Sequence, residues 1–485
     1  MKSLAEKVQR MGVNSIAILA SDIFTRASSL FVYILVGRYG EGSEFGQLSL
    51  GLMLLYTFHV FAVAGLPTLL VRDVASSHRG ARRILYHGYL AAFIPAMLSL
   101  VAMALFAILI RYSATTTFVI LLLSLALLPY AFNVISESVI RGCQKMPWIV
   151  IGNIPGSLFL VLGCCAVIAT GASVVQLAMV VVISRFIGMF AMHGCCLRVT
   201  YGLRVGALRF RYARLLLLKS LVFLWSDAIA AISASLNSIL LSKFAGEREV
   251  GWLTACFQLL QPMLMIYRSV GNSCFPVLVQ SVQNKKDSLG EICQTLIVLL
   301  WRIAIPATLT LFCLAGDILV LVYRKEEFRA ASTILQILSF TLLLDTLNPV
   351  IGHGLWAAGK DRLVLNIVVV NFIFSSCLSS LLVWQFGIMG AAWSVLLSSI
   401  VNVVQHYAYF EFSVGSLSLL KEFWKLIPIL LISSLIFLVP THFYVQLGVA
   451  LLVYGGASLW VLRPFVENFS IKASIKSKAG AKVSS

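Results

Sequence analysis

Apolar runs of roughly twenty residues, separated by polar residues or by glycine and proline, recur along the whole chain. A helix needs about 20 apolar residues to cross the hydrocarbon core of a bilayer, where its backbone groups must be paired within the helix. The pattern therefore predicts an all-α polytopic membrane protein. The expected transmembrane helices, with ends placed to within a few residues, span 13–36, 46–70, 84–110, 117–137, 148–170, 174–197, 219–243, 250–279, 291–314, 330–352, 363–384, 389–410, 423–440 and 443–462.

The composition of the 485-residue chain supports this prediction. Hydrophobic residues make up 60% of the chain and charged residues 12%, and the mean hydropathy is +0.95. Water-soluble chains carry about 25% charged residues, so the composition excludes a soluble enzyme, a nucleic-acid-binding protein and a disordered scaffold. The net charge of +18 would suggest nucleic acid in a soluble protein, but here its distribution along the chain is more informative.

The lysines and arginines predict the orientation of the chain in the membrane. With a cytosolic N-terminus, 26 of them fall on the cytosolic side, seven in outer loops and four within transmembrane helices. By the positive-inside rule, this bias predicts that both termini are cytosolic. We expect the protein to be located in the inner (plasma) membrane.

An internal repeat relates residues 21–49 to residues 226–254 at a fixed offset of 205, with eight identities in 29 positions. Asp22, Glu44 and Gly46 correspond to Asp227, Glu249 and Gly251, matches that shared apolar composition does not readily produce. Two parallel repeats are typical of alternating-access transporters. The expected domains are a six-helix lobe at 1–197, a basic cytosolic linker at 198–218, a second six-helix lobe at 219–412, and two further helices with a basic cytosolic tail at 413–485.

Four arginines lie within the expected transmembrane helices, and a charge there costs about 2.5–3.5 kcal/mol near a helix centre. We therefore expect them to face protein or water. Arg26 in 13–36 and Arg268 in 250–279 each share one helix face with polar residues, although interhelical packing is the alternative interpretation of such polar residues. A guanidinium offers paired donors to phosphate, so we expect an anionic substrate. The candidate substrate-binding residues of this cationic cavity are Arg26, Arg185, Arg268, Arg302, Gln258, Gln261 and Asn272.

Three carboxylates are candidates for ion coupling: Asp22, Asp227 and Asp345. Asp22 and Arg26 are four residues apart on a helix, and a neutralising pair is the plain interpretation of both. Asp227 has Ala231 where the repeat would place an arginine, so it needs another partner, a proton or a cation. An ion pair of Asp227 with Arg268 or Arg302 is an equally simple alternative.

Sequence motifs of other chemistries are missing. The chain contains no GxxxxGK[ST], no HExxH and no pair of CxxC motifs with zinc spacing, so we expect no enzymatic activity, no cofactor and no metal site.

Two stretches carry a family resemblance. The first is Val36-Gly37-Arg38-Tyr39-Gly40, Glu44 to Leu50, Gly65-Leu66-Pro67 and Val71-Arg72-Asp73-Val74-Ala75; the second is Phe328-Arg329-Ala330-Ala331, Ile334 to Leu338, Gly359-Lys360 and Phe386 to Ala392. They resemble the polysaccharide and O-antigen flippases (Wzx-type) of the multidrug/oligosaccharidyl-lipid/polysaccharide exporter superfamily.

This resemblance implies a fourteen-helix, two-lobed flippase that moves an undecaprenyl-diphosphate-linked oligosaccharide across the bacterial inner membrane, driven by H+ or Na+. The four arginines would bind the diphosphate and sugars, and Asp22 or Asp227 would couple the ion. Membrane proteins of polysaccharide assembly are expected partners. The alternatives are a drug/cation antiporter of the same superfamily, a lipid II flippase, a membrane glycan polymerase or glycosyltransferase, and a structural partner of a polysaccharide-synthesis complex.

Overall fold

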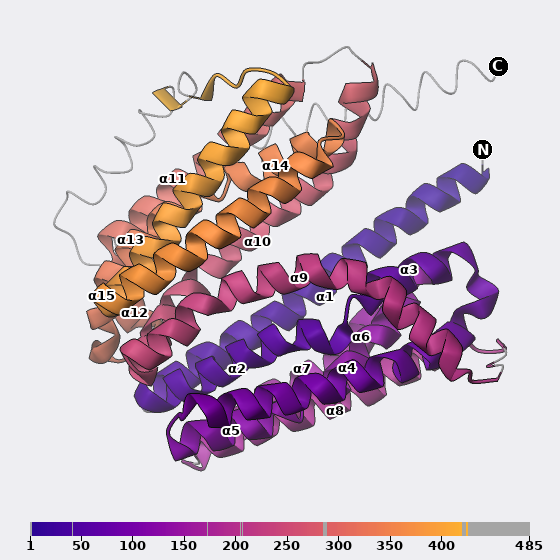
Figure 1. Ribbon diagram of the computed structural model, residues 1–485, viewed down its shortest axis with the longest axis horizontal. Coiled ribbons are helices and arrows are strands. Elements are labelled where there is room, and N and C mark those ends of the chain that lie inside the picture. The colour runs from indigo at the N-terminus through magenta and orange to yellow at the C-terminus, as the bar shows by residue number, and fades with distance from the viewer. Residues whose placement is uncertain are drawn as a thin grey trace. The chain divides into compact units, whose positions relative to one another are not determined.

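The computed structural model describes residues 2–40, 42–171, 173–203, 205, 207–284, 289–419 and 423–424, and these ranges contain helices and connecting turns but no strand. The predicted all-α fold is confirmed. The helices are α1 (Lys2–Tyr39), α2 (Gly42–Val63), α3 (Leu66–Ser76), α4 (Ala81–Ile110), α5 (Ala114–Ser124), α6 (Leu127–Gly142), α7 (Pro147–Ala169), α8 (Val174–Val199), α9 (Phe210–Phe244), α10 (Glu247–Asn284), α11 (Leu289–Cys313), α12 (Ala315–Tyr323), α13 (Ser332–Leu344), α14 (Leu347–Ala357) and α15 (Asp361–Ser413), with short 3-10 helices at His78–Gly80 and Glu326–Ala331 (Figure 1).

The described part of the chain contains nine helices long and apolar enough to cross a membrane, or ten if the two segments of α9, which are bent by 49° between Trp225 and Asp227, count as one span. The first ten expected spans each correspond to a helix or a pair of helices in the structure, and the eleventh and twelfth are the two segments of α15. The expected pair at 423–440 and 443–462 lies almost entirely outside the described residues.

Helix boundaries repeat with the sequence. α1 ends at Tyr39 and α2 begins at Gly42, while α9 ends at Phe244 and α10 begins at Glu247. Both boundaries differ by the same 205 residues that align the two sequence segments. The repeat is therefore also a repeat of local structure.

The chain forms two compact units. The first contains Met1–Gln258, Val322–Lys325 and Ser379–Ala391, and the second contains Leu259–Leu321, Glu326–Leu378 and Ala392–Ser485. α9, which the repeat assigns to the second lobe, packs against α2, α3 and α4 in the first unit. The lobe boundaries at 197 and 219 stay predictions.

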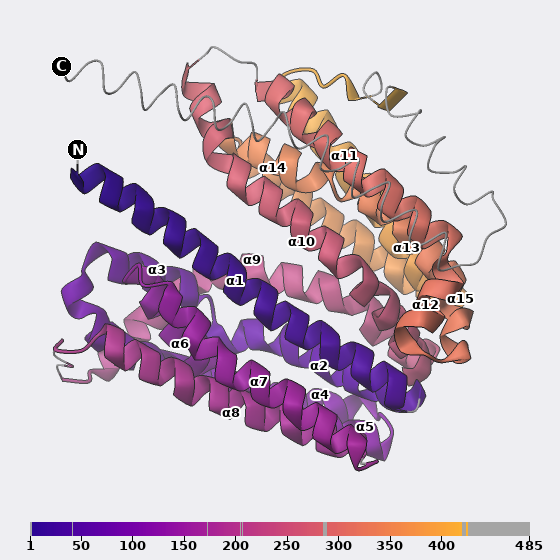
Figure 2. The same ribbon diagram turned by 180° about the vertical axis from the view of Figure 1, so that it is seen from behind.

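In the first unit, α1 packs along α7, and α7 pairs with α8 (Figure 2). Small residues allow these helices to approach: a Cβ atom on Gly156 of α7 would lie 3.0 Å from the Cα atom of Gly188 on α8. A buried apolar cluster that includes Leu70, Leu85 and Ile135 joins α3, α4 and α6. α6 also packs against α8, and α2 packs against both, so these three helices lie side by side.

The second unit packs α11 against α13 and α14. Close approach again depends on glycine, because a Cβ atom on Gly354 would lie 2.8 Å from the ring of Phe410 and 3.0 Å from the sulfur of Cys293. α15 contains two spans, since the backbone at Gly387 has φ 55° and ψ −130°. This break lies between the expected spans 363–384 and 389–410 and confirms their separation.

The fourth expected span of each half is broken shortly before a proline. α5 gives way to α6 at Leu125–Ala126, and α13 gives way to α14 at Asp345–Thr346. Pro129 and Pro349 each follow the break by three residues and cannot donate to the carbonyl four residues earlier, at Leu125 and Asp345. Proline therefore explains both breaks.

Candidate functional site

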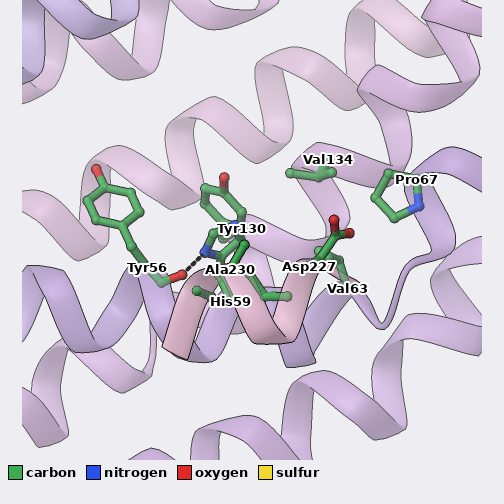
Figure 3. Close-up of a pocket in the computed structure, with 10 residues that line it drawn as sticks. Tyr56, His59, Val63, Pro67, Tyr130, Val134, Asp227 and Ala230 are labelled. Atoms are coloured by element: carbon green, nitrogen blue, oxygen red, sulfur yellow. Dashed lines mark hydrogen bonds between the residues drawn. The ribbon is translucent and has the colours of Figure 1, made fainter. Parts of the chain in front are cut away.

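A pocket in the first unit lies between α2, α3, α6 and α9, and its cavity volume is about 460 Å³. Regular helical spacing places its lining residues: Tyr56, His59, Val60 and Val63 share one face of α2, Tyr130 and Val134 one face of α6, and Asp227, Ala230 and Ala231 one face of α9, with Pro67 from the start of α3. Figure 3 shows the aromatic side chains of Tyr56, His59 and Tyr130 gathered at one end and the carboxylate of Asp227 at the other. The pocket thus has an aromatic end and an acidic end.

Arg185 of α8 reaches the aromatic end. Its Nη2 donates to the Tyr56 hydroxyl at 3.1 Å, and its guanidinium carbon lies 6.0 Å from the ring centroid of Tyr56 and 5.4 Å from that of Tyr130. These distances are those of cation–π contacts. The Nε atom of Arg185 is buried and has no acceptor among the described residues. Arg185 therefore keeps donor capacity for an anionic group.

His59 completes the aromatic end. Its ring centroid lies 4.8 Å from that of Tyr130 at an interplanar angle of 68°, and its Nδ1 is hydrogen-bonded to the backbone carbonyl of Tyr56. This bond fixes the imidazole ring to its own helix through Nδ1, and Nε2 is the ring nitrogen that does not take part in it.

Asp227 is exposed and forms no hydrogen bond or ion pair with the residues that the structure describes. Its neighbour on the pocket wall is Ala231, the position that corresponds to Arg26 in the first copy of the repeat. The arginine-to-alanine difference removes a local counter-charge from the carboxylate. A cation or proton is the chemical partner that such a site favours.

Asp22 and Arg26 both have exposed side chains on α1, and neither makes an ion pair with a described residue. The buried face of α1 is the adjacent one, where Ser21 accepts a hydrogen bond from Nδ2 of Asn153 on α7 at 3.0 Å. The local neutralising pair is thus not formed in this structure, and both charges stay available.

In the second unit, the charges of Arg268 and Asp345 interact. Asn348 donates to Oδ1 of Asp345 at 3.4 Å, while Oδ1 of Asn348 and the hydroxyl of Tyr267 are buried and find no partner among the described residues. Asp345 therefore lies in a polar cluster at the break between α13 and α14.

The other expected site residues are distributed along α10 and α11. Arg302 is exposed on α11, and Gln258 and Gln261 are half-buried on α10. The side chain of Asn272 lies outside the part of the chain that the structure describes. Arg26 and Arg185 belong to the first unit and Arg268 and Arg302 to the second, so one shared cavity stays a prediction.

Sequence reasoning missed Tyr56, His59 and Tyr130. The spacing of Tyr56, His59 and Val63 at i, i+3 and i+7 indicates one helix face, but an aromatic and apolar face on a transmembrane helix is also what lipid contact requires. Only the packing of α2 against α6 and α8 identifies these rings as the environment of Arg185.

The arrangement suits recognition of charge. Within the described residues no group of three or more His, Cys, Asp or Glu side chains could hold a metal ion. The pocket offers a carboxylate and two phenol rings, and the guanidinium that packs against these rings from α8 suits an anionic group.

Two family models match the chain: the model described as polysaccharide biosynthesis protein matches residues 11–282, and the MatE model matches residues 227–381. The chain is 26% identical over 167 residues to the probable low-salt glycan biosynthesis flippase Agl15 of Haloferax volcanii. That match covers 34% of this chain and about a third (35%) of the length of the relative.

Two solved structures share the fold. The lipid II flippase MurJ in an inward closed conformation superposes with a TM-score of 0.73 at 16% identity, covering 94% of this chain and 99% of MurJ. An inward-facing multidrug resistance transporter of the MATE family, of the MOP superfamily, gives a TM-score of 0.59 at 14% identity, covering 83% of this chain and 98% of its own. At these identities the likeness concerns the fold alone.

Proposed function

This chain belongs to the polysaccharide biosynthesis protein family, and from that premise we propose that it is a flippase for a lipid diphosphate-linked oligosaccharide. The proposed carrier lipid is undecaprenol, and the proposed direction is from the cytosolic to the outer leaflet of a bacterial inner membrane. The observation that carries the proposal is a pocket lined by Tyr56, Tyr130 and Asp227. The guanidinium of Arg185 packs against the two tyrosine rings, and Asp227 has no counter-charge among the residues that the structure describes.

Arg185 is the proposed diphosphate-binding residue of the first unit. A guanidinium stays charged at all physiological pH values and offers paired N–H donors to phosphate oxygens. The two tyrosine rings restrict its orientation, and aromatic faces also pack against sugar rings. Arg26, Arg268 and Arg302 are proposed to extend this cationic surface along the path of the headgroup.

Asp227 is the proposed site of ion coupling. A carboxylate in a mainly apolar pocket is costly when charged and alone, so binding of H+ or Na+ stabilises it. Because an ion gradient then supplies free energy to one conformation, binding at this site can direct the transport cycle. Asp345 and Asp22 are the alternative positions for this role.

The test is headgroup transport by purified protein in liposomes, with a labelled lipid diphosphate oligosaccharide and an impermeant reagent that modifies only outer-leaflet sugars. Arg185→Gln should reduce the transport rate at least about tenfold, because it removes a charged donor. Arg198→Gln is the matched control: it lies on the same helix, and its guanidinium contacts the Trp148 ring at 5.9 Å. Equal transport by Arg185→Gln and wild-type protein would reject the proposed role of Arg185.

Ion coupling has its own readout in the same liposomes. Wild-type transport should rise when a pH or sodium gradient is imposed, and Asp227→Asn should transport at a rate that no longer responds to the gradient. Asp227→Glu retains the charge and should retain part of the response. A gradient response unchanged in Asp227→Asn would move the role to Asp345 or Asp22.

A drug/cation antiporter is the second candidate, supported by the MatE match and by the carboxylate of Asp227, which has no partner among the described residues and lines a pocket with aromatic side chains. Efflux of organic cations by the same liposomes, without headgroup transport, would favour it. A lipid II flippase is the third candidate, and substrate competition between lipid II and other lipid diphosphate oligosaccharides distinguishes it.

A further inference from the structure

One end of the first unit carries a pair of reciprocal contacts between the two repeats. Arg38, at the end of α1, donates from Nε to the carbonyl oxygen of Val322 in the last turn of α12 at 2.5 Å. Lys243, the residue aligned with Arg38 in the repeat, donates from Nζ to the carbonyl oxygen of Ile110 in the last turn of α4. Each of the two aligned segments therefore places its basic residue on a helix end of the other expected lobe.

The two acceptor helices end in the same way. α4 is followed by Arg111 with φ 57°, and α12 is followed by Arg324 with φ 55°, both in the left-handed region that non-glycine residues rarely adopt. The two acceptor turns are therefore similar in conformation, although Ile110 directly precedes Arg111 and Val322 lies two residues before Arg324. The donors and the acceptors are thus both repeated.

A second reciprocal pair follows these arginines. The hydroxyl of Tyr112 is hydrogen-bonded to the Ser242 hydroxyl at 3.0 Å, and Lys325 donates to the carbonyl oxygen of Gly40. The ammonium of Lys243 also lies 4.6 Å from the ring centroid of Tyr112. In each repeat, the residue after the left-handed arginine reaches the end of the first helix of the other repeat.

Physical chemistry explains why basic residues occupy these positions. The last carbonyls of a helix lack intrahelical donors and carry the negative end of the helix dipole, so a cation there is stabilising. Reciprocal contacts of this kind are what a twofold axis between two equivalent halves produces. Single hydrogen bonds to backbone carbonyls can also be replaced by water when the halves separate.

The charge distribution gives these residues further weight. The positive-inside rule disfavours basic residues on the outer, non-cytosolic side of the membrane, and only seven lysines and arginines are expected on that side. Three of the seven, Arg38, Lys243 and Lys325, take part in the reciprocal contacts. A specific contact therefore explains the position of these three residues better than a random distribution of basic residues over the outer loops.

We propose that these four contacts, Arg38–Val322, Lys243–Ile110, Tyr112–Ser242 and Lys325–Gly40, form a latch that holds the two repeats together at the outer end of the protein. The latch must open when substrate leaves on that side, and in this respect the proposal rests on the proposed transport function. Because each contact of the latch has a counterpart in the other repeat, both sets of contacts must break for the latch to open.

The test is a distance measurement between spin labels at the exposed residues Thr115 and Ala330, in a variant without its native cysteines and in the absence of substrate. Arg38→Gln/Lys243→Gln should increase the ratio of long to short distances about tenfold over wild type, because two charge-assisted hydrogen bonds are lost. Arg111→Gln/Arg324→Gln is the matched control, since it removes two positive charges at the same end and leaves all four contacts in place. An unchanged ratio in Arg38→Gln/Lys243→Gln overturns the latch, as does an equal increase in the control.

Lys325→Gln provides a second variant if the double variant does not fold, and it should shift the ratio in the same direction by a smaller factor. The measurement is independent of transport. A shifted ratio in a protein that moves no oligosaccharide would leave the latch standing and reject the proposed function.

Discussion

Gly46 and Gly251, aligned positions of the repeat, face each other where α2 and α10 begin. A Cβ atom on Gly251 would lie 3.1 Å from the backbone nitrogen of Gly46 and 3.2 Å from its Cα atom, and a Cβ atom on Gly46 would lie 1.9 Å from the carbonyl oxygen of Glu247. Beside this contact, Nε2 of Gln47 donates to Oε2 of Glu247 at 3.1 Å. The two helices therefore touch through their backbones, as small residues allow in membranes.

Gly46→Ala should destabilise the protein more than Gly251→Ala. The added methyl group at Gly46 meets backbone and forces the helices apart, which costs about 1–3 kcal/mol or more, whereas the contact at Gly251 needs a shift of only a few tenths of an ångström. The measurement is the midpoint of thermal unfolding in detergent. Gly194→Ala is the control, because nothing lies within 4 Å of a Cβ atom there. Equal midpoints for the two repeat-aligned variants would contradict the asymmetry.

Removing the ring of Tyr130 should impair transport, while removing its hydroxyl should not. Tyr130→Leu abolishes a cation–π contact worth about 0.5–2 kcal/mol and frees Arg185 to change orientation, so we expect a loss of roughly three- to tenfold in the transport rate. Tyr130→Phe retains the ring and is the control. Tyr56→Phe should lie between them, because it keeps a ring but loses the acceptor of Nη2 of Arg185. A Tyr130→Phe variant as impaired as Tyr130→Leu would show that the hydroxyl matters instead.

Arg268 and Asp345 should be energetically coupled. The exposed position of Arg268 weakens the interaction through solvent screening, so a double-mutant cycle of Arg268→Gln and Asp345→Asn should give a coupling of about 0.5–1 kcal/mol in unfolding free energy. Arg302 makes no ion pair with Asp345 in the described residues, and we expect the cycle of Arg302→Gln with Asp345→Asn to be additive. An equal coupling energy in the Arg268 and Arg302 cycles would contradict a specific interaction between Arg268 and Asp345.

The thiol of Cys143 should react slowly with maleimides at neutral pH. Cys143 lies between α6 and α7, and burial raises its pKa while the nearby charge of Lys145 partly lowers it. A raised pKa means less thiolate at pH 7, so in a variant with Cys143 as its sole cysteine the rate should still be climbing when the pH passes the usual thiol pKa near 8.5. Lys145→Gln removes the lowering charge and should slow the reaction further, whereas Lys145→Arg should not. A Lys145→Gln rate equal to wild type would exclude this electrostatic contribution.

The helices were predictable from sequence because the backbone of a long apolar run can satisfy its hydrogen bonds in the hydrocarbon core only by forming a helix. The expected boundary between 363–384 and 389–410 coincides with the break at Gly387, and the offset of 205 reappears in the ends of α1 and α9. The start of α9 was not predictable, since the helix begins at Phe210, nine residues before the expected 219. The number of apolar residues locates the part of a helix that lies in the membrane, but it does not show where a helix that extends into water begins. There, the backbone N–H of Arg209 donates to Nε2 of His87 on α4 at 3.1 Å, a contact between distant residues.

The site was predictable only in its charged members. The free-energy cost of placing a charged side chain in the membrane identified Arg185 and Asp227, because a charge within an apolar run is rarely present without a function or a partner. Tyr56 and Tyr130 carry no such signal, because a tyrosine in a transmembrane helix serves equally at a lipid interface or in packing. The partner of Arg185 depends on the register of α8 against α2 and α6, which one sequence does not specify.

The breaks before Pro129 and Pro349 have a consequence for water. Each proline leaves the carbonyl oxygen four residues earlier, at Leu125 and Asp345, without its usual amide donor, well inside an expected span. Lipid tails supply no donor, so solvent is the natural substitute, and such backbone is tolerated where it lines a hydrated space. Each half would then admit water at its proline break, so a polar headgroup entering there would exchange one hydration shell for another rather than lose its own in a dry interior.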